Sequence, residues 1–167
     1  MTFSEGIKHA LQSQYTQGLV TDFYQPLLKE ATLYQRVSGY FSSAGLDLYV
    51  DGLEELARNG GEVQFIISKE ISQEDYLKIK EGYELLDRLK PLKIAERNSQ
   101  LTDKAQQQLG NLAFMIANGC ARVKVALTDK GIFHDKFGII SSNDDRIFFN
   151  GSMNETQSGI NTNYEKY

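Results

Sequence analysis

Cysteine, long apolar runs and excess positive charge are all scarce in this sequence of 167 residues. The single cysteine, Cys120, excludes an intramolecular disulfide and a CxxC metal site, and we expect it to be a small apolar residue near a helix end. No segment approaches the roughly 20 apolar residues that a membrane-spanning helix needs. The N-terminus also lacks the long apolar stretch of a secretory signal. We therefore expect a cytoplasmic protein with no membrane partner.

The charge balance is acidic, with a net charge of -4 and an isoelectric point near 5.2. This balance gives no bulk signature of nucleic-acid binding, although a local basic cleft can exist in an acidic chain. The sequence has only two histidines and no cluster of histidine, cysteine and carboxylate ligands, so we expect neither a metal nor another cofactor. The length suits one domain with a core, spanning residues 1–167.

Helix-like and strand-like patterns alternate along the chain, which predicts an α/β fold with a mixed sheet flanked by helices. Apolar residues at helical spacing, with glycine or proline stops, predict four helices. They cover residues 21–34, 44–61, 72–91 and 102–119. Apolar or alternating segments predict five strands, over residues 36–43, 62–68, 121–127, 132–140 and 146–150. A segment rich in glycine, serine and asparagine follows.

The predicted strand "IFHDKFGII" carries two basic residues, His134 and Lys136, within an apolar run. Residues two apart in a strand point to the same face, so these side chains lie about 7 Å apart. Gly138 is next on that face and leaves space above the backbone. Burying both basic groups without partners costs several kcal/mol, about 2–7 for a neutral polar group and more for a charge. The face therefore binds an anion or a carboxylate, unless this is an edge strand with solvated basic residues.

The order of motifs after this strand resembles the phospholipase D superfamily. Its signature is H-x-K, a strand, G-S-x-N and a later acidic residue. The matching residues here are His134, Lys136, Gly151, Ser152, Asn154 and Glu165. The earlier segment 36–68 is similar to the nuclease branch, whose domains are fused to helicases or occur in restriction and DNA-defence enzymes. One departure is Ser141, which stands where the family often has aspartate; Asp144 and Asp145 follow out of register.

The resemblance implies a metal-independent phosphodiesterase that acts on DNA through a covalent phosphohistidine. His134 is then the nucleophile or acid, Lys136 a phosphate ligand, and Asn154 a neutral donor. Glu165 orients a histidine. Ser152 and Gly151 complete the substrate contacts. Ser38 and Tyr40, on the first strand, are further candidates for substrate binding; the alternative for them is a strand edge and core packing.

The family's chemistry uses two histidines, whereas this chain has one H-x-K half-site. The other histidine, His9, has no lysine two residues later, and we expect it on the surface of an N-terminal helix. A homodimer whose two copies share one active site is the simplest solution. We also expect this chain to be the N-terminal part of a longer protein, with helicase or restriction domains after it.

Two other functions remain open. A lipid phosphodiesterase or phosphatidyltransferase is disfavoured because the sequence shows no amphipathic surface segment, polybasic patch or membrane anchor. A catalytically weak module that binds nucleic acid or dimerises, within a helicase or restriction enzyme, differs from the nuclease only in activity.

Overall fold

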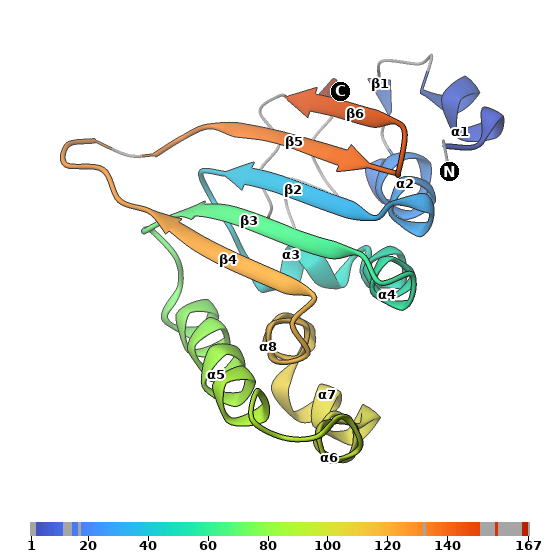
Figure 1. The fold of residues 1–167 in the computed structure, drawn as a ribbon. Coiled ribbons are helices and arrows are strands. Elements are labelled where there is room, and N and C mark those ends of the chain that lie inside the picture. Colours follow the sequence, from blue (N-terminus) through green and yellow to red (C-terminus); the bar gives the residue numbers. More distant parts are fainter. Residues whose placement is uncertain are drawn as a thin grey trace.

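The core of the fold is a five-stranded mixed sheet with the strand order β4-β3-β2-β5-β6 (Figure 1). It is seen in a computed structural model that describes residues 3–11, 15–16, 18–131, 133–150, 156 and 165–166. The strands are β2 (Leu33–Ser38), β3 (Glu62–Ser68), β4 (Ala121–Ala126), β5 (Lys136–Ser141) and β6 (Arg146–Asn150). Strands β2, β3 and β4 are parallel, and β5 is antiparallel to both β2 and β6. The prediction of a mixed α/β fold is confirmed.

Helices connect the parallel strands and also precede the sheet. They are α1 (Glu5–Ala10), the π-helical η1 (Leu19–Tyr24), α2 (Gln25–Glu30), α3 (Ser43–Asp47), α4 (Val50–Arg58), α5 (Gln73–Leu89), α6 (Ile94–Gln100), α7 (Asp103–Leu109) and α8 (Asn111–Ala117). A separate two-stranded sheet pairs β1 (Tyr15–Thr16) with β7 (Glu165–Lys166). None of the helices in the described residues combines the length and apolarity that crossing a bilayer requires.

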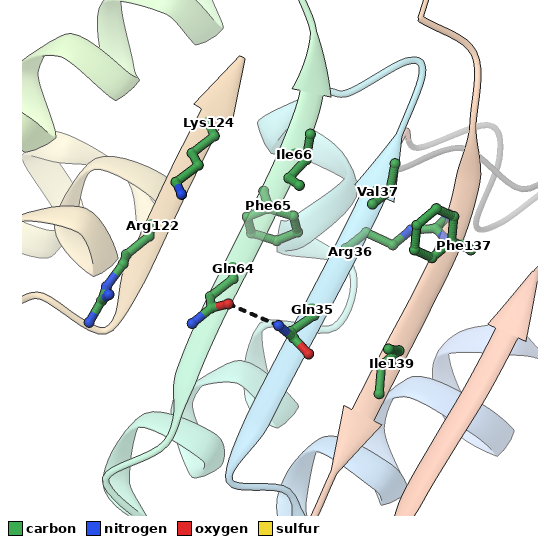
Figure 2. A pocket seen from close by; sticks show the side chains of 10 residues that line it. All are labelled: Gln35, Arg36, Val37, Gln64, Phe65, Ile66, Arg122, Lys124, Phe137 and Ile139. Atoms are coloured by element: carbon green, nitrogen blue, oxygen red, sulfur yellow. Dashed lines mark hydrogen bonds between the residues drawn. The ribbon is translucent and has the colours of Figure 1, made fainter. Parts of the chain in front are cut away.

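The two faces of the five-stranded sheet differ in what lies against them. Tyr34, Phe65, Ile140 and Phe149 point to one face and are at most 2% exposed, because the helices pack on them. We call the opposite side the open face. It carries Gln35 and Val37 of β2, Glu62, Gln64 and Ile66 of β3, Arg122 and Lys124 of β4, Phe137 and Ile139 of β5, and Arg146 and Phe148 of β6. Figure 2 looks onto this face, with helices behind the strands.

Several predicted boundaries were wrong, for identifiable reasons. The predicted helix 21–34 ends at Glu30, because Tyr34 pairs with β3 and β5 as part of β2. The predicted helix 102–119 is two helices that meet at Gly110, whose φ of 77° lies in the left-handed region that helices exclude. Helix α6 was not predicted, since it has no buried residue and hence no apolar stripe.

The start of α3 is fixed by a carboxylate from another helix. Asp75 of α5 is 4% exposed, and its Oδ1 accepts a hydrogen bond from the Ser43 backbone N–H at 2.9 Å. Its Oδ2 accepts from the Ser72 hydroxyl at 2.8 Å, and the Ser72 hydroxyl oxygen caps α5 by accepting from the Asp75 backbone N–H. Ser42, at the N-cap position of α3, makes no side-chain capping bond. One buried carboxylate therefore ties α3, which follows Tyr40, to α5.

Candidate active site

His134 and Lys136 lie at the end of the sheet where the parallel strands β2 and β3 finish. Ser38, the last residue of β2, pairs with Lys136, the first residue of β5. The connection from β4 to β5 extends beyond this end of the sheet (Figure 1). His134 precedes β5 and is exposed, whereas the sequence pattern predicted it within the strand. The strand begins later because β2, its pairing partner, ends at Ser38.

The two basic residues touch each other. The Lys136 Nζ lies 3.0 Å from Nδ1 and 3.1 Å from Nε2 of His134, and it donates to the His134 carbonyl oxygen at 3.0 Å. The Lys136 ammonium can only donate, whereas the roles of the two ring nitrogens depend on the tautomer. An imidazole and an ammonium thus lie side by side, and we call this pair, His134 and Lys136, the rim. This pairing suits an anion that needs both a nucleophile and a positive charge.

Gly39 allows the backbone at His134 to lie against β2. A Cβ added at Gly39 would stand 2.8 Å from the His134 Cα and 3.0 Å from the Phe133 carbonyl oxygen, both backbone atoms. No flexible side chain can move aside there. Only glycine therefore fits at this position without displacing the histidine.

Replacing Gly39 with alanine is expected to displace His134 and to slow a reaction that uses its imidazole about 10²-fold, because misplacing a catalytic group by about 1 Å costs that much. The control is Ser42→Ala, which changes a nearby residue whose side chain caps nothing. Thermal unfolding of both variants separates misplacement from loss of fold. Wild-type rates in a folded Gly39→Ala protein would show that His134 is not held by this contact.

Tyr40 and Ser38, predicted to bind substrate, have different environments. The Tyr40 ring is 42% exposed and meets the His134 ring edge to face, with centroids 5.6 Å apart and planes at 88°. Ser38 is fully buried, and its hydroxyl donates to the Tyr40 carbonyl oxygen at 2.5 Å. The structure therefore brings Tyr40 beside His134, while Ser38 shapes the turn that presents Tyr40.

A third cation, Arg36, lies beneath the rim and was not predicted as a site residue. It is 1% exposed, points to the same face as Lys136, and pairs with Gly138, the second residue after Lys136. Its guanidinium carbon lies 5.2 Å from the centroid of the Phe149 ring, a cation–π contact. Its side chain extends from β2 toward β5 (Figure 2). Alternation on β2 placed Arg36 on one face, but nothing in the sequence said which face is covered.

The neighbourhood of Lys136 lowers the pKa of its ammonium. Partial burial is the larger cause, the positive charge of Arg36 adds to it, and the carboxylate of Asp135 opposes both. Gly138 leaves room for the Phe149 ring, because a Cβ there would clash with that ring, which itself faces Arg36. The site therefore concentrates positive charge where a phosphate can neutralise it.

For the remaining predicted site residues, the structure describes only the backbone of Glu165. Gly151, Ser152 and Asn154 lie outside the described residues. Glu165 begins β7, where its backbone pairs with Thr16, and its side chain is not among those described. Their roles at the site stay predictions.

The departure at Ser141 leaves no carboxylate in its place. Ser141 is 7% exposed at the end of β5, where its carbonyl oxygen accepts from the Thr32 N–H at 2.8 Å. Asp145 accepts from the Phe3 N–H at 3.0 Å and lies 3.4 Å from the Lys8 ammonium. It therefore anchors the N-terminal segment and does not replace the missing aspartate.

Neither a thiol nor a metal cluster competes with this site in the part of the chain that the structure describes. Burial raises the pKa of the Cys120 thiol to about 11, so the thiolate is scarce at neutral pH. Cys120 follows α8, as predicted. The described residues contain no group of three or more histidine, cysteine or carboxylate side chains able to hold a metal ion.

Comparison with known proteins gives one match. A family model described as "Cardiolipin synthase, PLD-like domain" matches residues 25–167. The match begins at α2 and includes the five-stranded sheet with His134 and Lys136. Among curated proteins, the comparison finds no match.

Proposed function

This chain belongs to the family of PLD-like domains of the cardiolipin synthase type, and from that premise we propose that it is a metal-independent endonuclease that cleaves DNA. The family supports phosphodiesterase-type chemistry in general. The observation that carries the finer proposal is the exposed contact between His134 and Lys136, backed by the buried Arg36. Without a metal, these groups supply the nucleophile and the positive charge that the reaction needs.

The proposed reaction has two displacements. The unprotonated His134 nitrogen attacks phosphorus, the bond from phosphorus to the leaving oxygen breaks, and a second, protonated histidine gives that oxygen its proton. Water then attacks the phosphohistidine and passes a proton to the second histidine. The phosphorus–nitrogen bond breaks, and both imidazoles return to their first state. Lys136 donates to the non-bridging oxygens throughout, with Ser152 and Asn154 as neutral donors and Glu165 as the group that orients an imidazole.

One chain supplies only half of this site. The described part of the chain holds one histidine at the rim, and His9 lies on α1, outside the sheet. We propose a two-fold homodimer in which His134 and Lys136 of both copies surround one phosphate. The basic groups of the two copies would repel each other around one pocket, so the site would bind anions tightly. The two copies of Glu165 offset part of that charge.

Tyr40 favours a nucleic acid over a lipid as the substrate. Its ring is 42% exposed and stands against the His134 ring, so a base next to the bound phosphate could stack on it. A lipid phosphodiester presents no base for such a ring. The resemblance of residues 36–68 to the nuclease branch points the same way, and extends the proposal to a domain that acts within a helicase-associated or restriction enzyme.

Metal independence gives the direct test of this function. We expect cleavage of plasmid DNA and of bis(p-nitrophenyl) phosphate to continue in EDTA, because His134 and Lys136 do what a metal would otherwise do. Gel electrophoresis and release of p-nitrophenol measure the two reactions. Activity that needs added Mg²⁺ would refute the mechanism. DNA binding without any hydrolysis would leave the alternative, a binding module.

A further inference from the structure

The open face of the sheet has the chemistry of a nucleic-acid surface. Apolar side chains are exposed on this face: Ile66 of β3 is 40% exposed, Phe137 of β5 is 36% exposed, and Phe148 of the edge strand β6 is 61% exposed. The Phe137 and Phe148 rings lie side by side, with centroids 6.1 Å apart and planes at 32°. Exposed aromatic rings on adjacent strands offer flat surfaces on which successive bases can stack.

Both edge strands also carry cations on this face. Arg122 and Lys124 project from β4 at one edge, and Arg146 projects from β6 at the other. The only acidic residue on the open face strands is Glu62, which lies 3.1 Å from Arg122. Three positive and one negative charge give this face +2, in a chain whose net charge is -4. The open face thus has a net positive charge, which complements a polyanion.

A shallow hollow of about 300 Å³ runs across the same face. Gln35 and Gln64 lie on its floor, and their amides are joined by a hydrogen bond of 3.0 Å (Figure 2). Arg122 and Lys124 lie along its β4 side (Figure 2). Amides in a groove between aromatic rings and cations can donate to and accept from base edges.

The charge pattern disfavours a second copy of the chain on this face. Two sheets related by a two-fold axis and packed face to face would place each edge strand over an edge strand of the other copy. Because β4 and β6 are both cationic, either arrangement brings like charges together. A polyanion is attracted to both edges at once.

We propose that the open face binds single-stranded nucleic acid, with bases stacked on Phe137 and Phe148 and phosphates on Lys124, Arg122 and Arg146. This inference rests on the proposed function, since it assigns the path by which the substrate reaches the rim. Phe137 follows Lys136 directly and points to the open face, whereas Lys136 points to the other face. A nucleic-acid strand stacked on Phe137 would therefore pass the end of β5 that lies next to His134. Edge to edge the sheet spans about 19 Å, enough for several nucleotides.

The test uses a fluorescein-labelled oligothymidine of about 20 nucleotides, with binding to the protein followed by fluorescence anisotropy in EDTA. Phe148→Ala is expected to weaken binding about 5- to 150-fold, since one stacked base contributes about 1–3 kcal/mol. Lys124→Ala is expected to weaken binding and to lower the slope of log affinity against log salt by about 1. The matched controls are Tyr76→Ala and Lys80→Ala on α5, an exposed aromatic and an exposed cation away from the sheet. Their binding should equal that of the wild type.

Unchanged oligothymidine binding by folded Phe148→Ala and Lys124→Ala proteins would overturn the proposal. The proposal would also be overturned if the variants lost only self-association, measured by sedimentation, or only binding to anionic vesicles. The open face would then bind a protein or a membrane. Hydrolysis of bis(p-nitrophenyl) phosphate by the wild type is measured separately. If the wild type hydrolyses the ester but Phe148→Ala binds oligothymidine normally, only this inference is refuted. If Phe148→Ala weakens binding but the wild type hydrolyses nothing, the proposed nuclease is refuted and the nucleic-acid-binding face is supported.

Discussion

Replacing His134 with asparagine is expected to reduce phosphodiester hydrolysis to background. The change removes the nucleophile from one half of the shared site and the acid from the other, and loss of acid–base assistance alone lowers rates about 10²–10⁴-fold. Asparagine resembles the part of the histidine side chain nearest the backbone, and position 134 is exposed, so the variant should fold. A folded variant that keeps more than about a tenth of the wild-type rate would refute the catalytic role of His134, because the expected loss is about 10²–10⁴-fold. The matched control is His9→Asn, which changes the other histidine of the chain.

Mixed subunits extend this test to the assembly. Wild-type and His134→Asn chains, refolded together in equal amounts, should form random dimers, of which about a quarter keep both histidines. If each dimer has one site that needs both histidines, activity per wild-type chain falls to about half of its original value. If each chain has its own site, activity per wild-type chain is unchanged. Sedimentation of the mixture confirms that dimers form, and a monomer without activity would point to completion of the site by other sequence.

Replacing Lys136 with alanine is expected to lower the rate about 10²–10³-fold, the usual effect of removing one donor that stabilises transition-state charge. Lys136 is only partly buried and is the first residue of β5, so the unfolding temperature should change little. Lys130→Ala, which removes an exposed lysine from the preceding connection, is the control. Near-normal hydrolysis by Lys136→Ala would show that the phosphate is held by other groups.

The pH profile reports the state of the same lysine. Its ammonium is needed, so activity is present below its pKa and lost as pH rises through it. Because burial and Arg36 lower that pKa, the alkaline loss comes at lower pH than for an ordinary lysine, whose pKa is about 10.4. Arg36→Gln should move the loss to higher pH, and Arg36→Lys should keep it in place. Arg58→Gln, an exposed cation on α4, should also leave it in place.

The sequence predicted correctly those strands whose bounds are marked by neighbouring residues. Strand β3 was predicted with its bounds, and β4 within one residue, because alternating and apolar runs there are bounded by glycine stops. The split at Gly110 and the end of α2 depend on packing and on strand pairing between distant segments, which periodicity does not contain.

The candidate site was predictable to the extent that it follows the motif. The pattern identified His134 and Lys136 and placed them side by side, but as two members of a strand. Arg36 was not singled out, since its importance comes from β2 lying next to β5. The Gly39 contact with His134 depends on the same neighbourhood. Sequence spacing shows which residues share a face of one strand, and only the fold shows which strands are neighbours.

The pairing of β2 with β5 has a consequence for the order in which the chain folds. Thr32 and Ser141, at one end of this pair, are 109 residues apart in the chain. Closing so long a loop is entropically costly, and non-local pairing is slow. The segment between them builds β3, α5 to α8 and β4, whose contacts with each other are nearer in sequence. The residues around Tyr40 are synthesised first, and β2 gains its pairing with β5 only after residues 136–141 have been made. A partly folded chain can therefore hold most of its core and still lack the contact between Tyr40 and His134.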